Sequence, residues 1–234
     1  MRALLISNSG RPFLAHCRGA IAGFLGRARR LAFVTAASLS DEEAYFKVAR
    51  AALEAEPSGS TVEHLRWDAD FGPTLARAEA VFVGGGNTYA LLGRLRSSGL
   101  LDAVRGRVRA GLPYIGSSAG SNVAGPDILT TNDWNVVGLT AFDALGLVPF
   151  NINPHYLETD PAMAPGSETR DTRIAEYHAV RDNPVVGIEE STMLRVEGGA
   201  ATVLGTGRVR LFQRGREPRW LEAGQELPLE PPGK

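Results

Sequence analysis

Short apolar runs alternate with longer amphipathic segments along most of the 234 residues of the chain. The apolar runs predict strands at Arg2–Ser7, Leu31–Ala36, Val62–Trp67, Ala80–Val83, Leu112–Gly116, Leu147–Ile152 and Val185–Ile188. Helical spacing predicts helices over 18–29, from Ser40 onward, and over 75–78, 88–99, 101–110 and 169–180. Because the strands are continuously apolar rather than alternating, we expect an α/β fold with a mainly parallel sheet covered on both faces.

Two further features concern the ends and borders of these elements. Ser40 and Glu43 have the spacing of a capping box at the start of their helix. The segment TMLRVEGGAATVLGTGRVRLFQRG, which follows the last apolar strand, alternates strand and glycine turn and predicts antiparallel hairpins at a sheet edge. No internal repeat, low-complexity linker or shift of composition divides the chain, so we expect one domain over residues 1–234.

Composition and charge narrow the classes of function. A net charge of −1 gives no general attraction to nucleic acid or an anionic membrane surface. No stretch approaches the ~18 uninterrupted apolar residues of a membrane-spanning helix, and the run Ala3–Ile6 is too short for a signal peptide. The single cysteine, Cys17, excludes an internal disulfide and a multi-cysteine zinc site. A cytoplasmic enzyme or binding protein is therefore the default expectation.

Two glycine-rich turns follow predicted strands, at the edge where open parallel sheets bind ligands. The first, VFVGGGNTYALL, places Gly84–Gly86 before a helix, where close backbone approach and free amides can hold an anion or an oxyanion. The second, YIGSSAGSNVAG, has Gly116, Ser118 and Gly120 in the spacing of a nucleophile elbow. Such a turn needs small flanking residues and exposes the central side chain over a helix N-terminus, so Ser118 is the candidate nucleophile.

A nucleophilic serine needs a general base, usually a histidine, that a carboxylate orients. Of the four histidines, His16 lies in the first helical region, His64 in a strand without a turn motif, and His178 on a helix with charged neighbours. His155 follows Pro154, which ends a predicted strand at the expected carboxyl edge. His155 is therefore the candidate base.

Three carboxylates compete for the orienting position. Glu189 and Glu190 follow the last apolar strand, where a charge is costly unless it has a partner. Asp133, in the segment TTND, is their rival, and spacing alone does not choose among the three. Two further acidic residues are disfavoured because they lie close to the base along the chain: Glu158 and Asp160.

Arg170 opens the predicted helix in GSETRDTRIAEYH. A cation at this end opposes the helix dipole, which favours an anion-binding role over a purely structural one. A guanidinium fork can hold a carboxylate through two hydrogen bonds. The alternative is an exposed arginine without a ligand.

Taken in this order, these residues resemble peptidase E, the aspartyl dipeptidase family of serine exopeptidases. The matching segments run through most of the chain: LLISNS, VFVGGGNTYALL, YIGSSAGSNVA, TTND, FDALGL, NINPHY, GSETRDTRI and GIEE. The resemblance implies a flavodoxin-like three-layer fold related to class I glutamine amidotransferase domains, and a Ser-His-Glu triad. By position, Ser118 would be the nucleophile, His155 the base and Glu190 its orienting partner.

The resemblance also implies what surrounds the triad. The backbone amides of Gly86 and Ala119 would form the oxyanion hole, Arg170 would bind the side chain of the substrate aspartate, and Asp133 would support the site or bind substrate. It further implies a cytoplasmic homodimer that acts on small peptides without a metal or other cofactor. The chain departs from the family at Ser117, before the nucleophile, where the family often has a tryptophan.

We therefore expect a metal-independent serine dipeptidase that cleaves after an N-terminal aspartate through an acyl-enzyme. One alternative is a cyanophycinase-like hydrolase of β-aspartyl peptides. Another is a catalytically silent domain whose glycine turns hold an anionic metabolite. An amidotransferase-type glutaminase is disfavoured because the elbow carries Ser118 while Cys17 lies far upstream.

Overall fold

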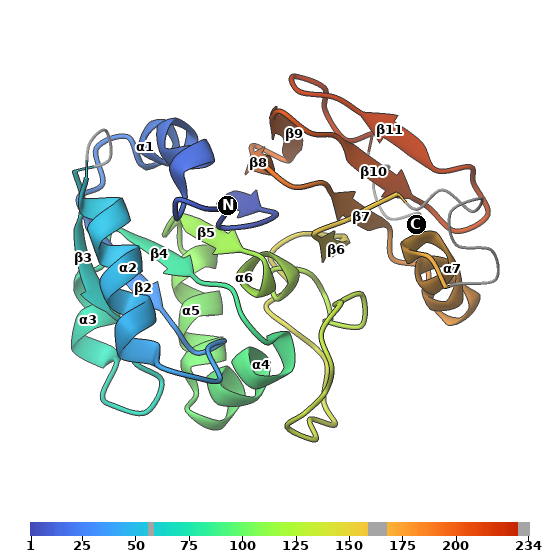
Figure 1. Cartoon of the computed structure of the whole chain (residues 1–234). Helices are drawn as coiled ribbons and strands as arrows, with labels where there is room; N and C mark the ends of the chain where they lie inside the picture. The colour runs from blue at the N-terminus through green and yellow to red at the C-terminus, as the bar shows by residue number, and fades with distance from the viewer. Residues whose placement is uncertain (56–58, 159–167, 229–234) are drawn as a thin grey trace.

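Seven strands form the main sheet of the computed structural model, which describes residues 1–55, 59–158 and 168–228 (Figure 1). Their order across the sheet is β3-β2-β4-β5-β1-β8-β9. Their bounds are β1 Arg2–Ile6, β2 Arg30–Val34, β3 Thr61–His64, β4 Ala80–Val83, β5 Tyr114–Ser117, β8 Thr192–Glu197 and β9 Ala200–Gly205. The first five strands in this order pair in parallel, and β8 and β9 extend the edge as antiparallel strands. The prediction of a mainly parallel sheet is confirmed.

Helices cover both faces of this sheet. Their bounds are η1 Ala15–Cys17, α1 Arg18–Leu25, α2 Glu42–Glu54, α3 Gly72–Arg77, α4 Thr88–Ser97, α5 Leu100–Arg109, α6 Ala119–Asn122 and, on the second sheet, α7 Arg170–Val180. Leu4 and Ile6 of β1 pack with α1 and α2, whereas Ala3 and Leu5 pack on the face of α4 and α5. Burial on both faces explains why the strands are apolar at consecutive positions. Within the described ranges, no helix is long and apolar enough to cross a membrane.

A second, four-stranded sheet lies beside the main one, in the order β11-β10-β7-β6 (Figure 1). Its bounds are β6 Asn151–Pro154, β7 Val185–Ile188, β10 Val209–Phe212 and β11 Arg219–Leu221. β6 and β7 are parallel, and the other pairs are antiparallel. Helix α7 packs on it through Ile174 and Tyr177, which contact Tyr156 and Phe212. The predicted antiparallel tail is confirmed, although β10 and β11 join this second sheet, which the sequence pattern did not predict.

Several helix borders differ by a few residues from the sequence-based prediction, and two of the differences have a clear physical reason. The cap of α2 is Asp41, not Ser40, because the Asp41 carboxylate accepts a hydrogen bond from Ala44 N at 2.9 Å. The helix predicted over 18–29 ends before Gly26, whose φ of 59° interrupts the helical conformation. Both differences are shifts of a few residues within an element of the expected type.

One predicted strand lies further along the chain. The run Leu147–Ile152 was expected to be a strand, whereas β6 begins only at Asn151. The amides of Leu145 and Leu147 bond to the carbonyls of Val123 and Ala124 behind α6, so this apolar segment packs as a turn rather than joining a sheet. Pro154 is the last strand residue, and the carboxyl end stays next to His155 as expected.

Candidate active site

Ser118 occupies a tight turn between β5 and α6. Its backbone has φ 53° and ψ −114°, a conformation that residues other than glycine seldom adopt. A Cβ on Gly116 would overlap the Gly120 carbonyl oxygen, and a Cβ on Gly120 would overlap that of Val83. The glycines on both sides of Ser118 are therefore required by backbone contact, as the elbow pattern predicts.

Three side chains from separate segments form a continuous hydrogen-bonded chain. Ser118 Oγ lies 2.8 Å from His155 Nε2, and His155 Nδ1 lies 2.6 Å from Glu190 Oε1. Ser118 follows β5 of the main sheet, whereas His155 and Glu190 follow β6 and β7 of the second sheet (Figure 1). His155 has a φ of 54°, so its backbone, like that of Ser118, is held in a rarely populated conformation.

The neighbouring Glu189 and the other acidic residues have different partners. Glu189 pairs with Arg208, accepting from its backbone N at 2.7 Å and from its guanidinium at 3.1 Å. Glu158 accepts from Arg210 at 2.7 Å. Asp160 lies outside the described residues. Among the described carboxylates that compete by sequence, Glu190 alone reaches His155.

Ser7 at the end of β1 is a contact that the sequence analysis did not single out. Its buried hydroxyl donates to Ile188 O at 2.8 Å and accepts from His155 N at 2.9 Å. The next residue, Asn8, accepts from Ser191 N at 3.0 Å. These bonds tie the segments of the base and of its carboxylate to the main sheet. The available signal was the polar pair that directly follows the first apolar strand.

Gly86 lines the same cavity as Ser118, and Ala119 directly follows Ser118 in the chain. Gly85 approaches so closely that a Cβ there would lie 2.9 Å from Ser118 Cβ. Ala119 is the first residue of α6, where an amide has no acceptor within the helix. Among the turn and loop bonds of the described residues, neither the Gly86 nor the Ala119 amide is a donor. Both amides are thus available to an incoming oxygen.

Asp133 lies at the N-terminus of α4 rather than at the base. Its Oδ2 accepts from Thr88 N at 2.7 Å and from Thr88 Oγ1 at 2.6 Å. Asn87 Nδ2 donates to the neighbouring Trp134 O at 3.0 Å. The Asp133 carboxylate therefore fastens the turn that carries Gly86, which favours the supporting role over contact with substrate.

Two cavities meet at His155. One, of about 540 Å³, is lined by Ser118, His155, Gly86 and the loop 37–41. The other, of about 450 Å³, is lined by His155, Asn132, Arg170 and Arg173. Among the described residues, no hydrogen bond or ion pair engages the Arg170 side chain. Burial, with Arg173 nearby, lowers the pKa of Arg170 from its ordinary value, although the group stays cationic at neutral pH.

Ser117 is buried and does not line the cavity. Its Oγ lies 3.0 Å from Ser9 Oγ, and Ser9 does line the cavity beside Ser118. Tyr45 OH nearby accepts from Gly85 N at 2.9 Å, and burial raises the pKa of Tyr45 to about 12, so the phenol is neutral. Among the described residues, the Ser117 hydroxyl is thus linked to the cavity by its hydrogen bond with Ser9.

No group of three or more His, Cys, Asp or Glu side chains in the described part of the chain could hold a metal ion.

Comparison with known proteins shows which proteins the chain is similar to. A family model described as Peptidase family S51 matches residues 3–204. Peptidase E of Streptomyces coelicolor is 45% identical over 230 residues, which cover 97% of this chain and 93% of that protein. A probable alpha-aspartyl dipeptidase of Drosophila melanogaster is 44% identical over 216 residues, covering 90% of this chain and 89% of that protein.

Solved structures share the fold. The crystal structure of a putative peptidase E protein from Listeria monocytogenes EGD-e superposes with a TM-score of 0.70 at 25% identity, covering 88% of this chain and 98% of that one. A peptidase from an acI-B1 actinobacterium superposes with a TM-score of 0.72 at 19% identity, covering 97% and 96%. The arrangement of both sheets thus recurs in solved proteins.

Proposed function

The chain belongs to peptidase family S51, and on that premise we propose that it is a serine exopeptidase that releases an N-terminal aspartate from dipeptides and short peptides. The observation that carries this proposal is the hydrogen-bonded chain from Ser118 through His155 to Glu190. The amides of Gly86 and Ala119, and an arginine that has no hydrogen-bond or ion-pair partner among the described residues, add to it. The similarity to the probable alpha-aspartyl dipeptidase of Drosophila melanogaster supports the choice of aspartate.

The hydrogen bonds define the tautomer of the base. An ionised carboxylate only accepts hydrogen bonds, so the 2.6 Å contact to Glu190 requires the proton on His155 Nδ1. His155 Nε2 then carries the free lone pair and accepts from Ser118 Oγ at 2.8 Å. His155 takes the Ser118 proton as the oxygen attacks the carbonyl of the first residue, and returns it to the leaving amine. A water molecule activated by His155 then hydrolyses the acyl-enzyme.

The two free amides stabilise the charge that develops during attack. The tetrahedral intermediate places its oxyanion near the Gly86 and Ala119 N–H groups, which need no reorganisation to donate. Donors of this kind each lower the barrier by roughly 3 kcal/mol in comparable sites. In this proposal, the N-terminus of α6 and the Gly84–Gly86 turn each supply one donor to the oxyanion hole.

Arg170 would select the substrate by its side-chain carboxylate. Its guanidinium lines a cavity with His155 and is half-buried, so a carboxylate there would be paired in a partly desolvated site. The test replaces Arg170 by Met and compares Asp-Leu with Asn-Leu, which differ only in that carboxylate. We expect kcat/KM for Asp-Leu to fall about 100-fold or more and that for Asn-Leu to change little.

The matched control is Arg181→Met, near the other end of α7. This variant should keep the preference for Asp-Leu over Asn-Leu. An equal loss on both dipeptides in Arg170→Met would contradict the assigned role.

Further properties are part of the same proposal. We infer a single peptidase domain over residues 1–234, supported by one apolar cluster that joins Ile152 and Val186 of the second sheet with Ala3 of the first. The order β3-β2-β4-β5 corresponds to the 2-1-3-4 order of flavodoxin-like sheets, which supports that label and the kinship with class I glutamine amidotransferases. The cytoplasmic location and the homodimer rest on the resemblance to peptidase E. Size-exclusion chromatography with light scattering tests the homodimer.

A further inference from the structure

The loop between β2 and α2 forms one wall of the cavity that holds Ser118. Its residues 37–41 line that cavity. Asn87 N donates to Ala37 O at 2.8 Å, and a Cβ on Gly86 would overlap the same carbonyl oxygen. The Gly86 backbone thus rests directly on Ala37, and a shift of the loop would move the Gly86 amide.

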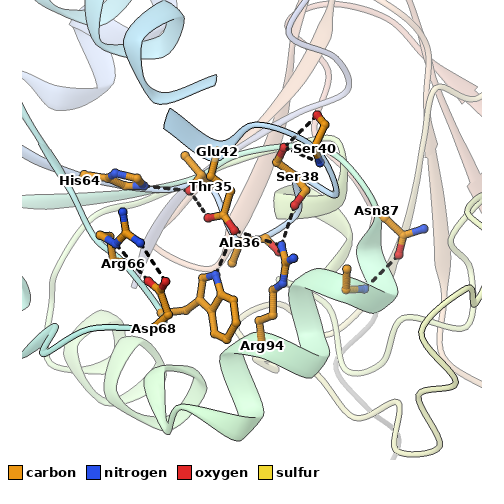
Figure 2. Close-up of polar contacts among 12 residues, drawn as sticks. Thr35, Ala36, Ser38, Ser40, Glu42, His64, Arg66, Asp68, Asn87 and Arg94 are labelled. Atoms are coloured by element: carbon orange, nitrogen blue, oxygen red, sulfur yellow. Dashed lines mark hydrogen bonds and ion pairs between the residues drawn. The ribbon is translucent and has the colours of Figure 1, made fainter. Parts of the chain in front are cut away.

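Arg94 of α4 bonds to the backbone of this loop (Figure 2). Its Nη1 donates to Ala36 O at 3.0 Å and to Ser38 O at 2.6 Å. These two carbonyls flank Ala37, on which Gly86 rests. Arg94 itself does not line the cavity of Ser118.

Glu42 fixes the guanidinium in place. Its Oε1 accepts from Arg94 Nη1 at 3.2 Å and from Trp67 Nε1 at 3.1 Å, and its Oε2 accepts from Thr35 Oγ1 at 2.6 Å (Figure 2). The Arg94 guanidinium also lies over the Trp67 ring, 5.0 Å from its centroid. The Arg94 side chain is only 26% exposed, so water competes little for these bonds.

We propose that Arg94 is a positioning residue for the oxyanion hole, acting on the Gly86 amide through the carbonyls of Ala36 and Ser38. The inference rests on the proposed function, because it takes Ser118 as the nucleophile and Gly86 as an oxyanion donor. Arg94 lies outside the cavity, so its loss misplaces a donor without removing a substrate contact. The effect therefore falls on kcat rather than on KM.

The experiment compares Arg94→Met with Arg107→Met in the full-length protein. Arg107 is a matched control because its Nη2 also donates to two backbone carbonyls, Ala76 O at 3.3 Å and Ala78 O at 3.2 Å, away from both cavities. With Asp-Leu, we expect kcat of Arg94→Met to fall about 10- to 100-fold while KM stays within about threefold. Arg107→Met should keep kcat even where its melting temperature falls.

Further variants separate positioning from charge and from folding. Arg94→Lys retains a donor and should recover part of kcat. Arg94→Met/Glu42→Gln also removes the negative charge of Glu42, which loses its cation in Arg94→Met. Its kcat should stay as low as that of Arg94→Met, because the loop carries the effect. If Arg94→Met does not fold, Arg94→Lys is compared with Arg107→Lys instead. We then expect kcat of Arg94→Lys to fall at least about threefold, while kcat of Arg107→Lys stays at the wild-type value.

A second readout does not depend on the substrate. A fluorophosphonate phosphonylates Ser118 through the same oxyanion hole: Ser118 Oγ attacks phosphorus, fluoride leaves and His155 takes the serine proton. Intact-mass spectrometry gives the rate of this labelling. If the wild type is labelled but does not cleave Asp-Leu, only the proposed substrate is overturned. The labelling rates of wild type and Arg94→Met would then still test the role of Arg94. A kcat or labelling rate of Arg94→Met within twofold of wild type overturns the inference, as does a wild type that is not labelled.

Discussion

Glu189 and Glu190 are adjacent carboxylates of the same type whose partners differ. Glu190 accepts from His155, whereas Glu189 is held by the Arg208 backbone and guanidinium. The guanidinium of Arg208 also lies over Trp220, 3.8 Å from the ring centroid, which keeps this arginine on the second sheet. The two neighbours therefore offer a test in which charge and position along the chain are nearly matched.

We expect Glu190→Gln to lower kcat on Asp-Leu by about 10²- to 10⁴-fold, because an amide no longer stabilises the imidazolium that forms on His155. Glu189→Gln should lower the melting temperature through the weakened Arg208 pair but leave kcat within about threefold. Steady-state kinetics and thermal denaturation of both variants measure this. The opposite ranking of the two in kcat would assign the orienting role to Glu189.

At the scale of single residues, the sequence predicts a site position only if the local backbone geometry restricts which residue type fits there. Gly116 and Gly120 mark Ser118 because no Cβ fits beside it, and that constraint is visible in the letters alone. The choice of Glu190 over Glu189 depends on the distant Arg208, which no spacing reveals. The contact of Ser7 with His155 likewise joins positions 148 residues apart.

At the level of elements, the site is built from carboxyl ends of strands. β4 leads to Gly86, β5 to Ser118, β6 to His155 and β7 to Glu190. Parallel pairing brings β4 to β5 and β6 to β7, so each pair of proposed site residues lies at one sheet edge. Helix α4 and the loop after β2 then fix the Gly86 turn.

His64 at the end of β3 makes the support of that loop sensitive to pH. Its Nε2 lies 2.8 Å from Thr35 Oγ1, whose proton goes to Glu42, so neutral His64 carries its proton on Nε2 (Figure 2). Burial lowers the pKa of His64 from its ordinary value, against the opposing effect of Glu43. The unfolded chain therefore binds a proton as pH falls below about 6.5, before the folded protein does.

The contribution of His64 to stability is thus present above about pH 6.5 and is lost as the pH falls below it. We expect the melting temperature of wild type to drop between pH 7.5 and 5.5 by more than that of His64→Gln. Differential scanning calorimetry at both pH values measures the two drops. Equal drops would contradict the role given to His64.

The sequence predicts the helices and strands well where apolar runs pack as strands of the main sheet. It predicts them less well where hydrogen bonds between distant segments determine where an element begins. The run beginning at Leu147 has a strand composition, yet its amides bond behind α6 and β6 starts later. Serine and aspartate both suit the N-cap position, so the residue types alone do not distinguish Ser40 from Asp41 as the cap of α2. Neither outcome has a local signal.

On the scale of the whole molecule, the proposed triad joins two sheets. Ser118 follows a strand of the main sheet, whereas His155 and Glu190 follow strands of the second (Figure 1). Ser7 bridges them by bonding to His155 and Ile188 at once. The sequence predicted one mainly parallel sheet with a hairpin tail, but the second sheet arises from long-range pairing of β6 with β7 and of β7 with β10, which periodicity does not report.

The central claim is that Ser118, not its neighbour Ser117, is the nucleophile of a dipeptidase that acts on N-terminal aspartate. Measurement of kcat/KM on Asp-Leu for wild type, Ser118→Ala and Ser117→Ala tests it most directly. We predict a loss of at least about 10⁴-fold in Ser118→Ala with an unchanged melting temperature, and a loss below about tenfold in Ser117→Ala, whose hydroxyl hydrogen-bonds to Ser9. Turnover of Ser118→Ala near that of wild type would contradict the claim.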